Sequence, residues 1–151
     1  MKVSAALEGI RRLYIDTAPL IYFVEENPAY VTKMDTVIAA VDGAAIEAVS
    51  LVITLTEVLV HPMRLKNIHL EGEYRDILFN SKGFHLQAVT ARIAEAAAGL
   101  RARYDLHTPD ALHIATAIEA GCDAFLTNDA GIKRVTELGV LILDELESDL
   151  P

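Results

Sequence analysis

The chain has 151 residues, the length of one domain, and 52% of them are hydrophobic, so a substantial core is available. Thirteen Lys and Arg stand against 22 Asp and Glu, and the formal net charge of −9 at pH 7 argues against binding a polyanion through a basic surface alone. The one cysteine excludes an internal disulfide and a cysteine zinc cluster. No apolar run reaches the roughly 20 residues of a membrane span, and the N-terminus lacks a signal-peptide pattern, so we expect a cytoplasmic protein without a membrane segment.

The first half of the chain predicts two buried strands that each lead into a helix. Residues 12–17 are β-branched and aromatic and end shortly before Pro19, which is typical of a short buried strand followed by a turn of helix. The pattern then predicts a helix over 27–43, a second buried strand over 46–54, a short helix ended by Pro62 and a further helix over 67–83. Residues 1–11 precede the first strand, and we expect them to form a small extra element or a partner contact.

The second half continues the alternation of strands and helices. It predicts strands over 84–89, 123–129 and 140–146, helices over 90–105 and 107–121, and a short helix over 130–139. Thr108 is expected to cap the second of the long helices, with Pro109 in its first position. Alternation of this kind predicts a single α/β domain over residues 1–151, with a mostly parallel sheet of about four or five strands and helices on both faces.

Four carboxylates lie where such a sheet would gather them. Ligands of open α/β sheets bind beyond the carboxyl ends of the strands, and Asp16 and Asp129 follow two of the predicted strands directly. Glu57 is expected on the first turn of the helix that leaves the second strand, and Asp110 on the first turn of the helix over 107–121. Asp110 could instead serve the helix dipole, and Asp129 could cap the short helix after it. Asp16 and Glu57 have apolar neighbours on both sides, so a purely structural role explains them less well.

Gathering four acids in one place requires a compensating positive charge. Like charges about 4 Å apart repel by roughly 4 kcal/mol at an effective dielectric near 20. Hard divalent ions such as Mg²⁺ or Mn²⁺ prefer oxygen ligands and keep several waters, so they suit an all-carboxylate pocket. Metal ions would also allow an acidic protein to act on a phosphodiester, by activating water and steadying the leaving oxygen. The sequence thus indicates metal-dependent phosphodiester hydrolysis.

The segments around these acids resemble the PIN domain, most closely its VapC-like branch of toxin ribonucleases. The resemblance covers residues 12–145 and rests on "YIDTAPLIYFVEENP", "ITLTEVLVHP", "HTPDALHIATAIEAGCDAFLTND" and "GVLILDEL". It implies that Asp16, Glu57, Asp110 and Asp129 are the metal-binding catalytic acids, supported by the polar residues Thr17, Thr127 and Asn128. It further implies an endoribonuclease that depends on Mg²⁺ or Mn²⁺, is often a homodimer, and is the toxin of a type II pair neutralised by a small VapB-like antitoxin whose tail enters the acidic site.

Other interpretations of the same residues stay open. The chain could be an RNA-processing nuclease of the same fold without an antitoxin, or a non-catalytic module whose acidic pocket binds a basic peptide. His61 and His113 share helix faces with Glu57 and Asp110, but no zinc pattern surrounds them, so packing or hydrogen bonding to a ligand residue is the expected role. Candidates for local RNA contacts are Arg101, Arg103, Lys133 and Arg134, although an ordinary solvated helix face explains them as well.

Overall fold

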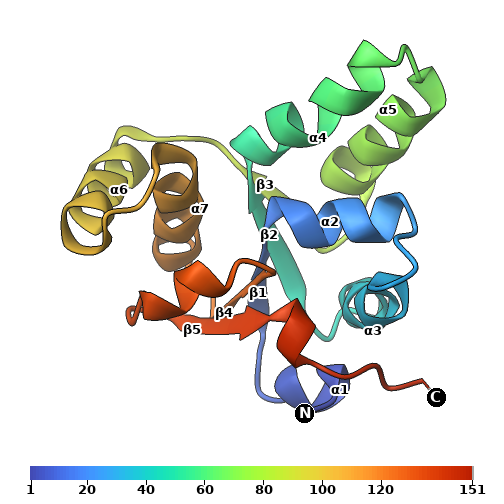
Figure 1. Ribbon diagram of the computed structural model, residues 1–151, viewed down its shortest axis with the longest axis horizontal. Coiled ribbons are helices and arrows are strands. Elements are labelled where there is room, and N and C mark those ends of the chain that lie inside the picture. Colours follow the sequence, from blue (N-terminus) through green and yellow to red (C-terminus); the bar gives the residue numbers. More distant parts are fainter. Residues whose placement is uncertain (151) are drawn as a thin grey trace.

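Five short strands pair in the order β3-β2-β1-β4-β5, and every pairing is parallel (Figure 1). The computed structural model, which describes residues 1–150, confirms the expected α/β fold with one parallel sheet. The strands are β1 (Arg12–Ile15), β2 (Glu47–Leu51), β3 (Phe84–Gln87), β4 (Ala124–Thr127) and β5 (Gly139–Ile142). The chain runs outward from the central β1 to β3, then returns to add β4 and β5 on the other side. The direction of the sheet order therefore changes between β1 and β4, which is where α/β sheets bind ligands.

Helices connect all the strands and cover both faces of the sheet (Figure 1). The α-helices are α1 (Val3–Ala6), α2 (Thr17–Val24), α3 (Val31–Asp42), α4 (Val52–Arg64), α5 (Ile68–Arg75), α6 (Ala91–Tyr104) and α7 (Thr108–Glu119). A π-helical turn, η1 (Asp76–Asn80), and two 3₁₀ segments, η2 (Ala130–Arg134) and η3 (Leu143–Glu145), complete the described elements. No helix among residues 1–150 is long and apolar enough to cross a membrane.

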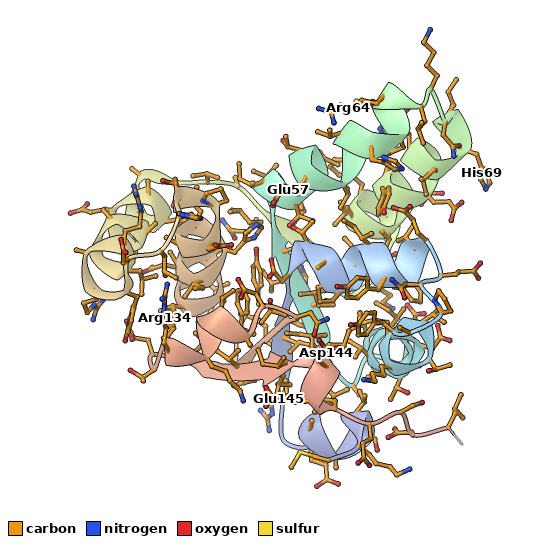
Figure 2. The ribbon with its side chains drawn as sticks, viewed as in Figure 1. Glu57, Arg64, His69, Arg134, Asp144 and Glu145 are labelled. Carbon is orange, nitrogen blue, oxygen red and sulfur yellow. The ribbon has the colours of Figure 1, made fainter. Side chains whose placement is uncertain are left out.

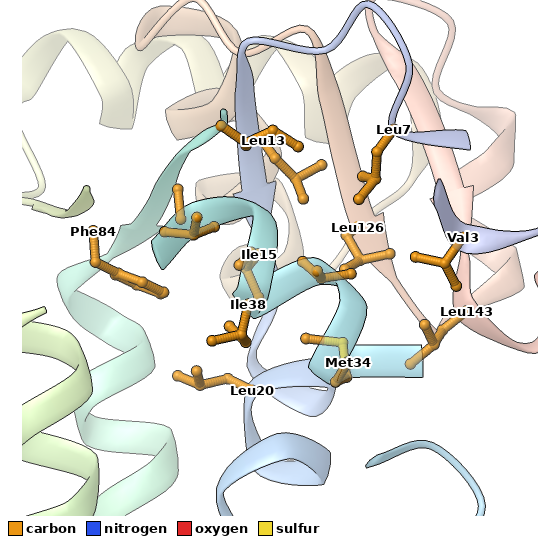
Figure 3. Packing of buried hydrophobic residues seen from close by; sticks show 14 of the residues in the cluster. Val3, Leu7, Leu13, Ile15, Leu20, Met34, Ile38, Phe84, Leu126 and Leu143 are labelled. Atoms are coloured by element: carbon orange, nitrogen blue, oxygen red, sulfur yellow. The ribbon is translucent and has the colours of Figure 1, made fainter. Parts of the chain in front are cut away.

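The alternation of side chains along β1 divides the core into two clusters. Leu13 and Ile15 face one way and pack with α1 to α5, together with Leu126 of β4 (Figure 3). Tyr14 faces the other way and packs with α6 and α7, where its ring stacks on Phe125 at a centroid distance of 4.8 Å. Because both faces of the sheet are buried, the strands read as continuous apolar runs in the sequence.

The second strand is shorter than the sequence predicts. It ends at Leu51, which is paired with Gln87 at the end of β3, and the residues from Val52 onward are helical. A short apolar run cannot be assigned to strand or buried helix by periodicity alone. Since α4 begins at Val52, Glu57 lies on its second turn. The predicted position of Glu57 on the first turn is therefore wrong.

Other boundaries differ from the predictions by a few residues. α4 passes through Pro62 and ends at Arg64, since a proline near a helix end removes only one late hydrogen bond. Residues 67–83 form α5 and then the π-helical turn in place of one helix. The N-cap position of α7 is His107, whose side chain makes no capping hydrogen bond, and Thr108 is the first helical residue. Only Ala130–Arg134 of the short helix forms, as a 3₁₀ segment, and the last strand gives way to η3 after Ile142.

The N-terminal residues form the extra element that was one of the two expectations for them. α1 places Val3 and Leu7 in the core beside α3. The Val3 N–H donates to the Glu147 carbonyl at 3.0 Å, and the Glu147 N–H donates to the Met1 carbonyl at 2.9 Å. This segment therefore holds the C-terminal part of the chain against the domain.

Candidate acidic site at the carboxyl edge of the sheet

Asp16 and Asp129 follow the neighbouring strands β1 and β4 and lie at the same edge of the sheet. Each opens the helical segment after its strand: Asp16 Oδ1 accepts the Thr17 N–H at 2.9 Å, and Asp129 Oδ1 accepts the Gly131 N–H at 2.9 Å. The capping role considered for Asp129 is thus confirmed. The capping hydrogen bond uses only Oδ1 of Asp129, and no donor among residues 1–150 binds its Oδ2.

Thr127 joins these two acids through its buried hydroxyl. Its Oγ1–H donates to Asp16 Oδ2 at 2.8 Å, and its Oγ1 accepts the Asp129 N–H at 3.1 Å. One side chain therefore fixes the orientation of Asp16 and the backbone position of Asp129. The supporting role of Thr127 in a metal site stays a prediction, and these hydrogen bonds are compatible with it.

Thr17 connects Asp16 to Glu57 in a similar way. While its N–H donates to Asp16, its hydroxyl donates to Glu57 Oε1 at 3.1 Å. The same Oε1 lies 2.7 Å from Nε2 of His113, a buried residue of α7. The hydrogen bond from His113 holds the pKa of Glu57 below its usual value, against the opposing effect of partial burial. Figure 2 shows Glu57 on α4 near the middle of the molecule.

Asp110 lies on the first turn of α7 and lines a hollow with Asp129 and Arg134. The hollow has a volume of about 300 Å³. Partial burial raises the pKa of the Asp110 carboxyl, and the nearby charges of Asp16 and Asp129 raise it further. Neither oxygen of Asp110 has a hydrogen-bond partner among the described residues, so its charge is left uncompensated by the protein.

The four acids have no compensating Lys or Arg. Among residues 1–150, no Lys or Arg forms an ion pair with Asp16, Glu57, Asp110 or Asp129, and His113 is the only basic residue paired with one of them. No three His, Cys, Asp or Glu side chains in this part of the chain lie close enough to bind one metal ion directly. An ion here would be held by one or two carboxylates and by water, the usual arrangement for Mg²⁺. The oxygen donors and the uncompensated charge fit a hard divalent cation.

The remaining candidates divide between the site and its surroundings. Asn128 has no hydrogen bond to the four acids: its Nδ2 donates to the Tyr22 hydroxyl at 3.4 Å and its Oδ1 accepts the Asp144 N–H at 2.8 Å. It thereby ties the end of β4 to α2 and η3. His61 lies in the last turn of α4, and its side chain has no hydrogen bond among the described residues.

Arg134 is the basic candidate that lines the hollow together with Asp110 and Asp129. It lines the hollow, where its Nη2 lies 3.4 Å from the Asp105 carbonyl, and Figure 2 shows it beside α7. The others have partners of their own: Arg101 donates to a backbone carbonyl at 2.9 Å, and Arg103 and Lys133 pair with nearby glutamates.

Tyr14 is a residue of this region that the sequence did not single out. It is fully buried in β1, and its hydroxyl lies 2.5 Å from Nδ1 of His113. The signal available in the sequence was a phenol in the middle of an apolar strand, since a buried tyrosine hydroxyl usually has a partner. The sequence could not identify that partner, which lies 99 residues further along the chain.

The chain is similar to known proteins over most of its length. The model of the PIN domain family matches residues 13–138. A toxin-antitoxin complex from Klebsiella pneumoniae contains a chain that is 23% identical with a TM-score of 0.68, and the match covers 87% of this chain and 97% of that one. No curated protein sequence matches significantly.

Two further solved structures share the fold at lower identity. VapBC2 from Rickettsia felis, bound to a DNA fragment from its promoter, is 15% identical with a TM-score of 0.70, covering 87% of this chain and 98% of that one. FitAcB from Neisseria gonorrhoeae is 16% identical with a TM-score of 0.68, covering 89% of this chain and 99% of that one.

Proposed function

The chain belongs to the PIN domain family, and from this membership we propose that it is a divalent-metal-dependent endoribonuclease. PIN domains are generally nucleases that use divalent metal ions. We further propose that the chain is the toxin of a toxin-antitoxin pair, because one of the solved structures described above is a toxin-antitoxin complex and another is VapBC2. RNA is the proposed substrate, and Mg²⁺ or Mn²⁺ the proposed cofactor.

The observation that carries the proposal is the uncompensated charge at the edge of β1 and β4. Asp110 is partly buried near two other acids, with no cationic partner. An arrangement that disfavours its own charge needs a function to explain it, and residues with perturbed pKa values in a hollow are candidates for one. A bound divalent cation would remove the repulsion and attract a phosphodiester.

Each acid has a proposed role in that reaction. At the strand ends, where Thr127 links Asp16 to Asp129, one or two of the four acids would bind a divalent ion directly and the others would contact it through water. Such an ion supplies an activated water and a counter-charge for the leaving oxygen of an in-line displacement. Arg134, which lines the same hollow, would contact a phosphate beside the cleaved bond.

Cleavage mapping on total RNA tests the proposal. The wild-type chain should cut RNA with Mg²⁺ or Mn²⁺ and not with EDTA, and Asp16→Asn should lose cleavage while remaining folded. Asp35→Asn is a matched control, because Asp35 is an exposed acid of α3 with no hydrogen bond to the site. Equal cleavage by Asp16→Asn and Asp35→Asn would remove Asp16 from the reaction.

Expression in cells separates the toxin from the two alternatives. A toxin should arrest growth, and coexpression of the small protein encoded beside it should relieve the arrest. An RNA-processing nuclease would cut RNA without such a partner. A module that only binds a basic peptide would leave every RNA intact at all metal concentrations.

Sedimentation of the purified chain tests the proposed homodimer.

A further inference from the structure

A buried chain of hydrogen bonds runs from the end of β2 to the carboxylate of Glu57. The Leu51 N–H donates to the Tyr14 hydroxyl at 3.0 Å, that hydroxyl lies 2.5 Å from His113 Nδ1, and His113 Nε2 lies 2.7 Å from Glu57 Oε1. Tyr14 is fully buried and His113 is 2% exposed. The chain therefore connects a fixed backbone amide to a partly exposed side chain at the acidic site.

The backbone amide sets the direction of every bond in this chain. An amide N–H can only donate, so the Tyr14 oxygen accepts from Leu51 and directs its own proton to His113 Nδ1. Nδ1 then acts as the acceptor, and Nε2 carries the imidazole proton and donates to Glu57. The opposite arrangement would leave the Tyr14 proton without an acceptor inside the core, which typically costs about 1–3 kcal/mol.

A second donor reaches the same oxygen of Glu57 from the other side. The Thr17 hydroxyl donates to Oε1 at 3.1 Å, and it also lies 3.2 Å from the hydroxyl of the fully buried Thr54. Because Thr17 uses its proton on Glu57, Thr54 supplies the proton of the bond between the two threonines. Oε1 thus accepts two hydrogen bonds, while no donor among residues 1–150 binds Oε2.

We propose that Tyr14 and His113 are positioning residues that hold Oε1 of Glu57 and reserve Oε2 as the oxygen that binds the divalent cation. The proposal rests on the proposed function of the site and assigns a task to two residues outside the four acids. Without the His113 imidazole, Glu57 Oε1 accepts only the hydrogen bond from Thr17, and the carboxylate is free to rotate. Bonds of this kind to a ligand typically change metal affinity by about 10- to 100-fold.

Mn²⁺ affinity, measured by electron paramagnetic resonance on the full chain, tests the effect on the ligand. His113→Leu should weaken Mn²⁺ binding by about 10- to 100-fold. His113→Gln, which keeps an N–H donor near the Nε2 position, should recover most of the loss. Thr116→Val is the matched control: Thr116 is equally buried on α7, but its hydroxyl donates only to the Leu112 carbonyl of its own helix. It should bind Mn²⁺ as the wild type does.

The protonation of the His113 ring tests the direction of the chain without metal or RNA. Long-range ¹H–¹⁵N spectra of the wild type should show the proton on Nε2 and a bare Nδ1, and Tyr14→Phe should lose this single arrangement. If His113→Leu does not fold, Tyr14→Phe still supports the proposal by losing both the arrangement and Mn²⁺ affinity.

Three results would overturn the inference or its premise. A proton on Nδ1 in the wild type contradicts the hydrogen-bond chain. Mn²⁺ affinities of the His113 and Tyr14 variants equal to that of Thr116→Val would show that the two residues only fill the core. A wild-type chain that neither binds Mn²⁺ nor cleaves RNA would overturn the function on which the inference depends.

Discussion

Asp110→Asn should be more stable than the wild type without a divalent ion and less stable than the wild type with one. Without metal, Asp110→Asn removes a charge that lies partly buried near Asp16 and Asp129. The macrodipole of α7 favours that charge by about 0.3–1 kcal/mol. The raised pKa of Asp110 nevertheless shows that burial and the two neighbouring acids outweigh any favourable effect. The variant should therefore be the more stable protein in EDTA.

The size of the effect follows from the exposure of the site. Interactions between charges that water screens are worth about 0.2–1 kcal/mol each. We expect a net gain of up to about 1 kcal/mol, which raises Tm by about 2–4 °C in a chain of this length. A ligand at about 100 times its Kd stabilises the folded state by about 2.7 kcal/mol. Mn²⁺ should thus raise the Tm of the wild type by about 5–10 °C, and that of Asp110→Asn by clearly less.

Thermal unfolding followed by circular dichroism measures all of these quantities. Both proteins are heated in EDTA and in a series of MnCl₂ concentrations, with Asp35→Asn as the control for loss of one negative charge. The control should respond to Mn²⁺ as the wild type does. An Asp110→Asn variant that is less stable in EDTA, or that gains as much from Mn²⁺ as the control, would refute the electrostatic reasoning.

Three further predictions concern residues around the site and at the opposite edge. Gly131→Ala should reduce metal-dependent cleavage with little change in Tm, because a Cβ there would lie 3.1 Å from Asp129 Oδ1 and shift that carboxylate by a few tenths of an ångström. Unchanged cleavage would contradict this. Asp123 accepts the N–H groups of Arg11 and Arg12, which lower its pKa below the ordinary 3.8, so its contribution to stability is present above that value and is lost on acidification. Asp123→Asn should therefore flatten the acid side of the stability profile and leave RNA cleavage intact. Burial raises the pKa of the Cys122 thiol to about 12, so iodoacetamide should label it at pH 8 only after denaturation, as mass spectrometry would show.

The fold could be predicted from the sequence because each strand is a buried apolar run closed by a turn or helix signal. The same property prevented a correct prediction of where the second strand ends. After Leu51, the run of Val52, Ile53 and Thr54 is apolar enough for a strand or a buried helix. Gln87, the last residue of β3, pairs with Leu51, so β3 offers no pairing partner for Val52 and the residues after it. That information lies in another part of the chain, so no local pattern could supply it.

The site, too, could be predicted from the sequence only in part. The rule that strand ends meet at one edge sufficed to select Asp16 and Asp129, and the structure shows that Thr127 links them. It could not show that Asn128 turns toward Tyr22. Nor could it show that the exposed Asp123, at the opposite edge, binds two backbone amides of the chain entering β1. Side-chain direction depends on tertiary neighbours that residue type and spacing do not specify.

The bond from Thr127 to Asp16 joins residues 111 positions apart in the chain. A ribosome releases the first of them long before the second, so most of the polypeptide leaves the exit tunnel before the two strand ends can meet. The central strand must wait for a neighbour that is made late, while β2 and β3 can already pair on its other side. Assembly of the acidic edge is thereby one of the last events in the biosynthesis of this molecule.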